Sequence, residues 1–407
     1  MDYNGQRTTV NGPLSTVQRM KLPRPSVLAF AVALLLLIAG ALALFTPKLR
    51  VLALEADVRR LGGQLSVERA GPRWLDRLAR EYGYGGLLGV FDTRVAAVKL
   101  GHASLDDRWV ARLAHYTDIV RLDLSHTQIT DAGLASLGRL TKLQVLDVSQ
   151  TDIHGPGLAI LEKCPRLVAL DVYGCPVEGD ALRHLADATA LEMLDLTGIH
   201  FTAGCLKHLG KCRALSNLCL ESTSATDADL ADLEALSGLK ILCLMDTAVG
   251  DSGLISIKEL PNLTFLDLRG TRVTDAGLTS LAGLHQLNSL PVARTAITDR
   301  GLETLSRMPA LQLLDLSGTS VTDEGMTKLQ RLPLLISLGL ANTQIGDRGL
   351  DAIGSRQSGR AWINLTNTRV SPERIAELRI IHPHWIIEER RIPEWTLDAD
   401  IVGMGMQ

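Results

Sequence analysis

Aromatic side chains and cysteine are both scarce in this sequence, which has 407 residues and a formal net charge of −3. Phe, Trp and Tyr together make up 4% of the chain, and there are 6 cysteines without a C-x-x-C pair. Such sparse cysteine excludes a small disulfide scaffold and offers no zinc-binding pattern. The near-neutral charge lacks the basic excess of a dedicated nucleic-acid binder, so no nucleic-acid partner is expected. A hydrophobic content of 46% excludes a chain that is disordered throughout.

Catalytic motifs are missing as well. The sequence has no Walker motif, no G-x-S-x-G and no H-E-x-x-H, the patterns that position a phosphate, a serine nucleophile or a zinc ion. His382-Pro-His384 offers too few partners for a metal. We therefore expect no enzymatic activity, no cofactor and no metal site.

The few aromatic residues are unevenly distributed. Between residues 117 and 361 there are only Tyr173, Phe201 and Phe265, and all 5 Trp lie outside that stretch. A chain of this length normally divides into domains or consists of repeats, because single cores stop growing near ~250–300 residues. A long uniform segment between different ends favours a repeat array.

A long uncharged segment precedes this uniform stretch. Residues 27–45 read VLAFAVALLLLIAGALALF, and ~20 apolar helical residues span a bilayer core of ~30 Å. The sequence therefore predicts a transmembrane helix over 26–46, after an N-terminal tail over 1–25. A cleaved signal peptide is the alternative, because Ala41-Leu42-Ala43 matches a small-x-small cleavage site. The apolar run, however, exceeds the ~7–15 residues of such a signal.

The charges around this segment do not decide its orientation, since four Lys or Arg residues lie on each side. A long C-terminal domain is translocated largely regardless of nearby charge, so we expect a single-pass membrane protein with its repeats outside the cytoplasm. Residues 47–66 are predicted to form a juxtamembrane helix or linker. The apolar positions from Leu49 to Leu61 have helical spacing there, and Gly62-Gly63 follows them.

A three-residue pattern, apolar-x-apolar, recurs every 24 residues along the rest of the chain. Alternation of this kind predicts short strands whose apolar side chains face a core. These strand cores begin at Val98, Leu122, Leu146, Leu170, Leu194, Leu218, Leu242, Leu266, Leu290, Leu314 and Leu338, and a final one at Ile363 is offset by 25 residues. Such regular spacing predicts a solenoid, in which each coil buries its apolar edge against its neighbours.

Two polar motifs follow most strand cores. A Thr recurs where the chain leaves the strand, as at Thr127 and Thr151, and its hydroxyl can satisfy backbone groups of the turn. Thr-Asp-x-Gly-Leu then occurs at 130–134, 274–278 and 298–302. Thr and Asp favour a helix N-terminus, and the Leu-x-x-Leu spacing that follows predicts a short helix with one apolar side.

These motifs resemble those of the leucine-rich repeat family, and the whole layout is similar to that of bacterial membrane-anchored leucine-rich repeat proteins. The resemblance implies an α/β fold, a right-handed α/β horseshoe with about 12 parallel strands, here with one N-terminal transmembrane helix. The repeats would occupy 95–370, between an N-terminal cap over 67–94 and a C-terminal cap and tail over 371–407. Members of the family mostly bind other macromolecules through the concave strand face.

Residues next to the inward-facing Leu positions of each strand are expected on that concave face. The candidate ligand-binding residues are Arg121, Asp123, Asp147, Asp171, Tyr173, Asp195, Ile241, Met245, Phe265, Asp267, Arg269 and Trp362. Four of them form a row of carboxylates on successive strands, which should raise some of their pKa values. This row is either a site for a cation or basic partner, or hydrated strand filling, and the second interpretation is favoured.

Ile241, Met245, Phe265 and Arg269 fall on two adjacent strands beside Asp267. Aromatic residues and Arg dominate binding hot spots, so this group is the best candidate for one. Cross-strand packing without a ligand is the alternative. Substituting Phe265 or Arg269 by Ala should weaken binding without unfolding the array.

The sequence therefore predicts a membrane-anchored scaffold that binds a protein or cell-envelope ligand. The alternative is a structural envelope component whose repeats associate with one another, and the oligomeric state is left open. Cys219 and Cys243 are neighbours in one column. Their Cα separation permits a disulfide, but parallel Cβ vectors oppose one, and two free thiols are the favoured interpretation.

Overall fold

The computed structural model describes residues 49–69, 93–354 and 360–389. The chain forms two compact units, 1–53 with 71–92 and 54–70 with 93–407, and the described residues belong almost wholly to the second. Within the described ranges, no helix is both long enough and apolar enough to cross a membrane. The predicted transmembrane helix over 26–46 lies outside these residues.

One sheet of 14 strands runs through the second unit, in the order of the sequence. All twelve predicted strand cores fall within it, and each strand pairs in parallel with the next. The parallel strands are β2 (Thr93–Lys99), β3 (Arg121–Asp123), β4 (Val145–Asp147), β5 (Ala169–Asp171), β7 (Met193–Asp195), β9 (Asn217–Cys219), β10 (Ile241–Cys243), β11 (Phe265–Asp267), β12 (Ser289–Pro291), β13 (Leu313–Asp315), β14 (Ser337–Gly339), β15 (Ala361–Asn364) and β16 (Trp385–Glu388).

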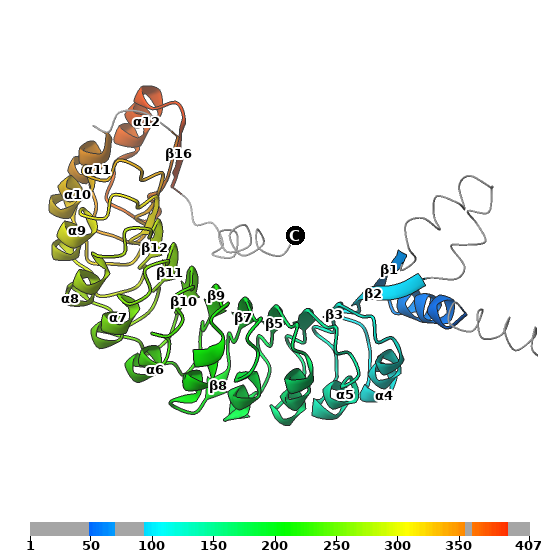
Figure 1. Cartoon of the computed structure of the whole chain (residues 1–407). Helices are drawn as coiled ribbons and strands as arrows, with labels where there is room; N and C mark the ends of the chain where they lie inside the picture. Colours follow the sequence, from blue (N-terminus) through cyan, green and yellow to red (C-terminus); the bar gives the residue numbers. More distant parts are fainter. Residues whose placement is uncertain (1–48, 70–92, 355–359, 390–407) are drawn as a thin grey trace, which may run out of the picture. The chain divides into compact units, whose positions relative to one another are not determined.

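The opposite side of each coil carries a short helix (Figure 1). Along the curved array of repeats, the strands line the inner side and the helices the outer side. The α-helices are α4 (Asp107–Val110), α5 (Asp131–Ser136), α6 (Asp227–Ala231), α7 (Asp251–Ile257), α8 (Asp275–Leu278), α9 (Asp299–Leu305), α10 (Asp323–Leu329), α11 (Asp347–Gly354) and α12 (Pro372–Ile381). The 3-10 helices are η1 (Ala111–His115), η2 (Pro156–Lys163), η3 (Ala181–Leu185), η4 (Cys205–Lys211) and η5 (Thr279–Leu281).

The core lies between these two sides and consists almost entirely of aliphatic side chains. The first and third residues of the strand pattern are buried in every repeat. Leu122 and Leu124, for example, have at most 1% of their surface exposed. The helix positions Leu134, Leu137 and Leu140 are fully buried. One coil supplies both layers, so each repeat depends on its neighbours for burial.

The ends of the array differ from its interior. Residues 49–60 are helical, and Gly62 follows with a left-handed φ of +78°. Next comes β1 (Gln64–Arg69), which pairs antiparallel with β2, so this stretch is a strand where part of a helix or linker had been predicted. Most of the predicted N-terminal cap lies outside the described residues. At the other end, α12 and β16 lie within the predicted C-terminal cap, and β16 closes the sheet.

The Thr column closes the turn after each strand, as predicted. In every repeat that carries it, the Thr hydroxyl donates to the backbone carbonyl three residues earlier, for example Thr247 Oγ1 to Leu244 O at 2.7 Å and Thr271 Oγ1 to Leu268 O at 2.7 Å. In one repeat Cys175 takes this position, and its Sγ donates to Val148 O of the preceding repeat at 3.0 Å. In these ten repeats a side chain therefore satisfies a carbonyl of the turn or of its neighbour, whereas Ala103 and Ile199 take the position in the other two and have no side-chain donor.

The residue immediately before the Thr column has a left-handed backbone in all twelve repeats, and this was not predicted. Several of these residues are glycine, but the others carry side chains and have φ between 53° and 62°. They are His102, His126, Gln150, Gly174, Gly198, Ser222, Asp246, Gly270, Arg294, Gly318, Asn342 and Asn367. A left-handed residue turns the chain sharply away from the strand.

The Thr-Asp-x-Gly motif joins successive repeats. Thr274 is the N-cap of α8, and its backbone N–H and hydroxyl both donate to the carboxylate of Asp251, in the preceding repeat, at 2.8 and 2.7 Å. The same pair of bonds joins Asp275 to Thr298 and Asp299 to Thr322. The Asp was expected to stabilise its own helix dipole, but its carboxylate also binds the next helix.

The Gly of the motif makes room for that carboxylate. A Cβ added to Gly277 would lie 2.3 Å from Asp251 Oδ1 and 3.1 Å from Asp251 Cα. Two successive repeats depart from this pattern together, with Ala203 where the Asp of the first is expected and Asp229 where the Gly of the second is expected. There the buried Asp229 carboxylate accepts from the N–H and hydroxyl of Thr226 and from the N–H of Gly204. A carboxylate thus occupies the space in either arrangement.

Candidate functional site

The predicted concave face is the solvent-facing side of the sheet. In β3, β4, β7, β9 and β13 the middle residue is buried and its two neighbours are partly exposed or exposed. Successive strands pair in register, so equivalent positions line up in rows across the array. The candidate residues therefore lie in ordered rows, about 4.8 Å apart from strand to strand.

Four carboxylates form the first group, on β3, β4, β5 and β7. Each Oδ1 accepts a hydrogen bond from the backbone N–H two residues later, at 3.1 Å for Asp123, 3.0 Å for Asp147 and 2.9 Å for Asp171 and Asp195. Asn364 makes the same bond to Thr366 at 2.9 Å. The acids therefore have a local structural role at the end of each strand.

Two of these acids have raised pKa values, with burial as the main cause. Burial raises the pKa of Asp171 to about 7, against the hydrogen bond from Tyr173, and the charges of Asp195, Asp147 and Asp123 add to the rise. Burial also raises the pKa of Asp147. A cation bound here would have to displace a proton near neutral pH. Within the described ranges, no group of three or more His, Cys, Asp or Glu residues could hold a metal ion.

A second group lies on β10 and β11. Ile241 pairs in register with Phe265, and both side chains are partly exposed on the concave face. Met245 follows β10 at the same offset as Arg269 follows β11, and both are partly exposed. Three apolar side chains are thus partly exposed to solvent on adjacent strands, and one of them is aromatic in a protein with few aromatic residues.

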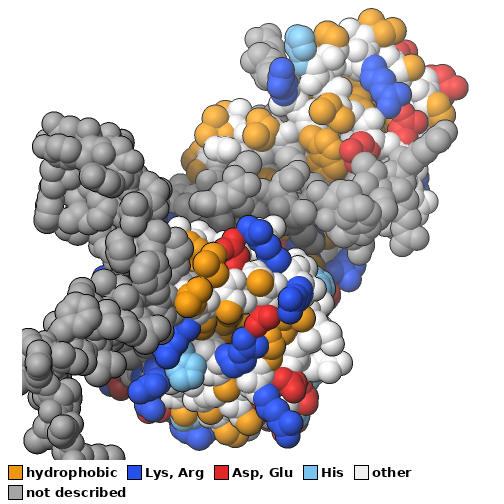
Figure 2. All heavy atoms as spheres, turned by 90° about the vertical axis from the view of Figure 1, so that its right-hand side faces the viewer, with side chains coloured by type: hydrophobic (Ala, Val, Ile, Leu, Met, Phe, Trp, Pro, Cys, Tyr) orange, Lys and Arg blue, Asp and Glu red, His pale blue; other side chains and the backbone are white. Residues whose placement is uncertain are grey.

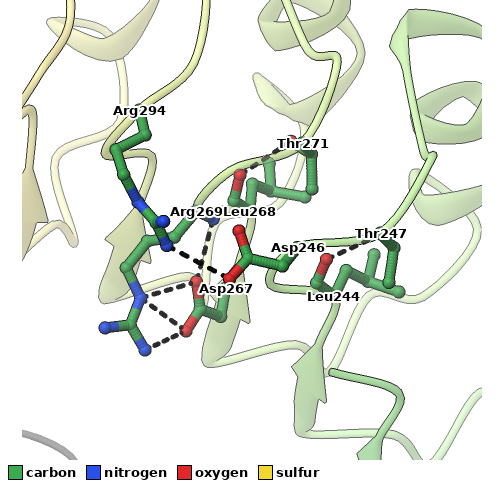
Figure 3. Close-up of polar contacts among 8 residues, drawn as sticks. All are labelled: Leu244, Asp246, Thr247, Asp267, Leu268, Arg269, Thr271 and Arg294. Carbon is green, nitrogen blue, oxygen red and sulfur yellow. Dashed lines mark hydrogen bonds and ion pairs between the residues drawn. The ribbon is translucent and has the colours of Figure 1, made fainter. Parts of the chain in front are cut away.

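Arg269 is held within this group rather than offered to a ligand. Its guanidinium binds Asp267 through Nε at 2.9 Å and Nη2 at 2.6 Å, as Figure 3 shows. Only 3% of the Asp267 side chain is exposed, against 17% for Arg269. An isolated buried carboxylate is costly, so Arg269 compensates the charge of Asp267. Substituting Arg269 by Ala would leave this carboxylate uncompensated, so the variant is expected to lose stability even where the array stays folded.

A neighbouring ion pair was missed by the sequence analysis. Arg294 Nη2 lies 3.3 Å from Asp246 Oδ2 and spans two repeats (Figure 3). Both residues belong to the left-handed column, and Gly270 stands between them in that column, where a Cβ would lie 2.0 Å from Asp246 Oδ1. The sequence clue was an Asp, a Gly and an Arg at 24-residue intervals before the Thr column.

The remaining candidates lie apart from this group. Tyr173 follows β5 and is 41% exposed. Trp362, on β15, pairs with Ser337 on one side and with Ile386 of β16 on the other. Ile386 is 62% exposed and was not among the predicted residues. The concave face therefore has an acidic part on β3–β7, an apolar part on β10–β11 and a second apolar part on β15–β16.

Comparisons with known proteins agree with this architecture. A family model described as a leucine-rich repeat matches residues 117–138, 259–282 and 308–329. The chain is similar in structure to an internalin (inlF) from Listeria monocytogenes, with a TM-score of 0.59 and 18% identity over 75% of this chain and 91% of that one. It is also similar to a TDR receptor, with a TM-score of 0.51 and 17% identity over 72% of this chain and 56% of that one. No curated protein matches the sequence. At these identities the structural likenesses concern the fold alone.

Proposed function

Because the chain is a leucine-rich repeat protein, we propose that it is a membrane-anchored scaffold that binds a protein or cell-envelope ligand through its concave strand face. The fold is typical of protein-binding domains. Binding, rather than catalysis, is the function that an ordered row of side chains on an open sheet supports.

The observation that carries this proposal is the apolar group on β10 and β11. Ile241, Met245 and Phe265 are partly exposed on the solvent side of the sheet, where polar filling would suffice for folding. Apolar side chains gathered on such a surface mark contact sites in many proteins. Tyr173 and Trp362 add aromatic contacts on either side, and aromatic residues supply much of the energy of protein interfaces.

The binding test uses the full chain and compares Phe265→Ala with Ile255→Ala. Ile255 lies in α7, on the helical side, and is 53% exposed, so its substitution removes a similar apolar area away from the proposed site. We expect Phe265→Ala to reduce the amount of ligand captured from envelope extract by about tenfold, as for a loss of ~1.4 kcal/mol. Ile255→Ala should capture as much as the wild type. Equal capture by both variants would exclude this site.

Membrane anchoring through residues 26–46 and an extracytoplasmic repeat domain are part of the proposal. The uncharged composition of residues 27–45 supports the anchor. The orientation rests on the translocation of long C-terminal domains regardless of nearby charge. Protease added to intact cells should digest the repeats. Digestion only after lysis would show that the repeats lie on the cytoplasmic side. Release of the protein by salt alone would argue against an anchor.

Self-association is the second candidate, and the C-terminal end of the array favours it. Ile380 and Ile381 of α12 are 81% and 59% exposed, close in the sequence to the exposed Ile386. On the face seen in Figure 2, the described residues show apolar side chains in separate groups among charged ones. Stable self-assembly usually requires a larger continuous apolar area than separate groups of this kind provide. Light scattering of the purified chain separates the two functions, because a monomer argues against self-assembly.

A further inference from the structure

Two thiols lie in contact at the centre of the concave face. Cys219 is the last residue of β9 and Cys243 the last residue of β10, and the two pair in register. Their Sγ atoms are 3.6 Å apart. Both occupy the position that the carboxylates fill on other strands, so both side chains leave the same face of the sheet.

The other four cysteines are used differently. Three thiols donate to backbone carbonyls: Cys164 to Leu140 O, Cys175 to Val148 O and Cys212 to Leu185 O. The fourth, Cys205, lies 2.9 Å from the Thr202 hydroxyl. Each of these thiols thus contacts an oxygen atom of the chain, whereas Cys219 and Cys243 face one another.

The backbone spacing suits a covalent bridge. Adjacent parallel strands lie about 4.8 Å apart, within the ~4.4–6.8 Å that Cα atoms span across a disulfide. Parallel Cβ vectors would normally keep the sulfur atoms too far apart. Here the strands lie on the inner side of the curve (Figure 1), so side chains on neighbouring strands converge, and the two Sγ atoms are already in contact.

We propose that Cys219 and Cys243 form a reversible disulfide that joins β9 to β10. The oxidant is a low-molecular-weight disulfide of the glutathione class. The two cysteine sulfurs lose two electrons and two protons and form one S–S bond. The S–S bond of the small disulfide breaks, and its halves take up those electrons and protons to leave as two thiols.

The two cysteines have different parts in this exchange. Cys219 is partly exposed, so it reacts first and becomes a mixed disulfide. Cys243 is buried beside it and attacks Cys219 Sγ, which releases the second small thiol. The hydrogen bond with Cys219 and then burial raise the pKa of Cys243 well above its usual value, so this second step is slow.

A carboxylate stands on each side of the pair, because Asp195 pairs in register with Cys219 and Asp267 with Cys243. Their charges add to the rise in the pKa of Cys243, so the reduced pair holds this group as a neutral thiol. A thiol of raised pKa is also a poor leaving group, so the bridge should reopen slowly once it has formed.

The test uses the full chain, reduced and then incubated with oxidised and reduced glutathione at about pH 8, where an ordinary thiol is partly ionised. After quenching and unfolding, free thiols are alkylated and counted by mass spectrometry. The chain has 6 cysteines, so we expect 6 − 2 = 4 labels and a peptide pair linking Cys219 to Cys243. Cys243→Ser should instead hold a glutathione adduct on Cys219, because the second attacking thiol is gone.

Cys164→Ser is the matched control, because Cys164 is also buried but far from the pair in sequence. It should keep the bridge and give three labels from its five thiols. Circular dichroism verifies that each variant folds. Six labels on the wild type after equilibration in excess oxidised glutathione would overturn the proposal. So would a stable adduct on wild-type Cys219, or linked peptides from any other pair.

Discussion

The repeats from α7 to α11 and those of η2, η3 and η4 share one sheet but are joined differently on their convex side. In the first region, carboxylates such as Asp251 bind the cap of the next helix. In the second, the three helices are 3-10 in form and none begins with a Thr that caps it, although Asp131 still accepts from the backbone N–H groups of Gly155 and Gly157 at the start of η2. Hydrogen bonds between side chains join neighbouring coils there, His184 with Glu162 and His208 with Asp180, both at 2.7 Å.

The difference shows that the two sides of a coil can vary separately. The strand, the left-handed residue and the buried turn continue through both regions, with Cys175 in place of Thr in one of them. The central coils also add the small parallel pair β6 (Glu178–Gly179) and β8 (His200–Phe201). The concave face therefore stays regular while the contacts between helices change.

The largest effect on stability is expected at a glycine of the first region that lies against the carboxylate of the preceding repeat. Gly277→Ala would place a Cβ 2.3 Å from Asp251 Oδ1, which must move and lose its bonds to Thr274. We expect a loss of about 2–4 kcal/mol in the free energy of unfolding, measured by urea denaturation. Gly210→Ala is the control from η4, because its added Cβ would meet no atom within 4 Å. This change should be neutral or stabilising by up to ~0.5 kcal/mol. Similar losses in both variants would remove the distinction.

A smaller effect is expected from cutting a single joint in each region. Asp251→Ala leaves the N–H and hydroxyl of Thr274 without their acceptor, at a cost of about 1.5–3 kcal/mol. Glu162→Ala breaks the hydrogen bond with His184, but the Glu162 side chain is 60% exposed, so less than ~1 kcal/mol is expected. The same denaturation measurement compares the two variants. If Glu162→Ala cost as much as Asp251→Ala, the hydrogen bonds between the central coils would be equivalent joints.

The smallest effect concerns the shared concave face and depends on pH. The pKa of Asp171 is raised from 3.8 to about 7, so the folded chain holds a proton that the unfolded chain has lost. Its stability therefore falls as pH rises from about 4 to about 7. Asp171→Asn stays neutral and can keep the bond to Tyr173. It should gain on the order of 1–2 kcal/mol over the wild type above pH ~7, after allowance for solvent screening, and almost nothing near pH ~4.

Asp315→Asn is the matched control for this pH profile. Asp315 accepts the same bond from Ser317 at 2.9 Å, but its row neighbours are the uncharged Pro291 and Gly339. Its substitution should leave the shape of the stability profile unchanged. An equal, pH-dependent gain in both variants would show that the carboxylate row is not the cause.

Much of the fold could be predicted because its determinants are periodic. The 24-residue spacing located the twelve strands, and the Thr column predicted hydrogen bonds that the structure contains. The left-handed column was not predictable residue by residue, since Gln150, Ser222 and Arg294 have no strong preference for φ above zero. Only the position, immediately before Thr, reveals it.

Contacts between repeats were harder to foresee than contacts within one. Local rules assign Asp251 to its own helix, but stacking brings the cap of the next helix within 2.8 Å. The bond between Arg269 and Asp267 could have been expected, because residues two apart share one face of a strand. The strand β1 has no repeat pattern and depends on pairing with β2.

The Asp-to-Thr joint has a consequence for how such an array could lengthen. Within one coil, the Asp carboxylate binds the following coil, and the Gly makes room for the carboxylate of the preceding coil. In α8, Asp275 contacts the following coil and Gly277 the preceding one. A duplicated coil of this type carries both halves of the joint, so its insertion restores two complete contacts. The coil with Ala203 lacks one half. Duplication is thus structurally neutral in one part of the chain and requires a compensating carboxylate, like Asp229, in the other.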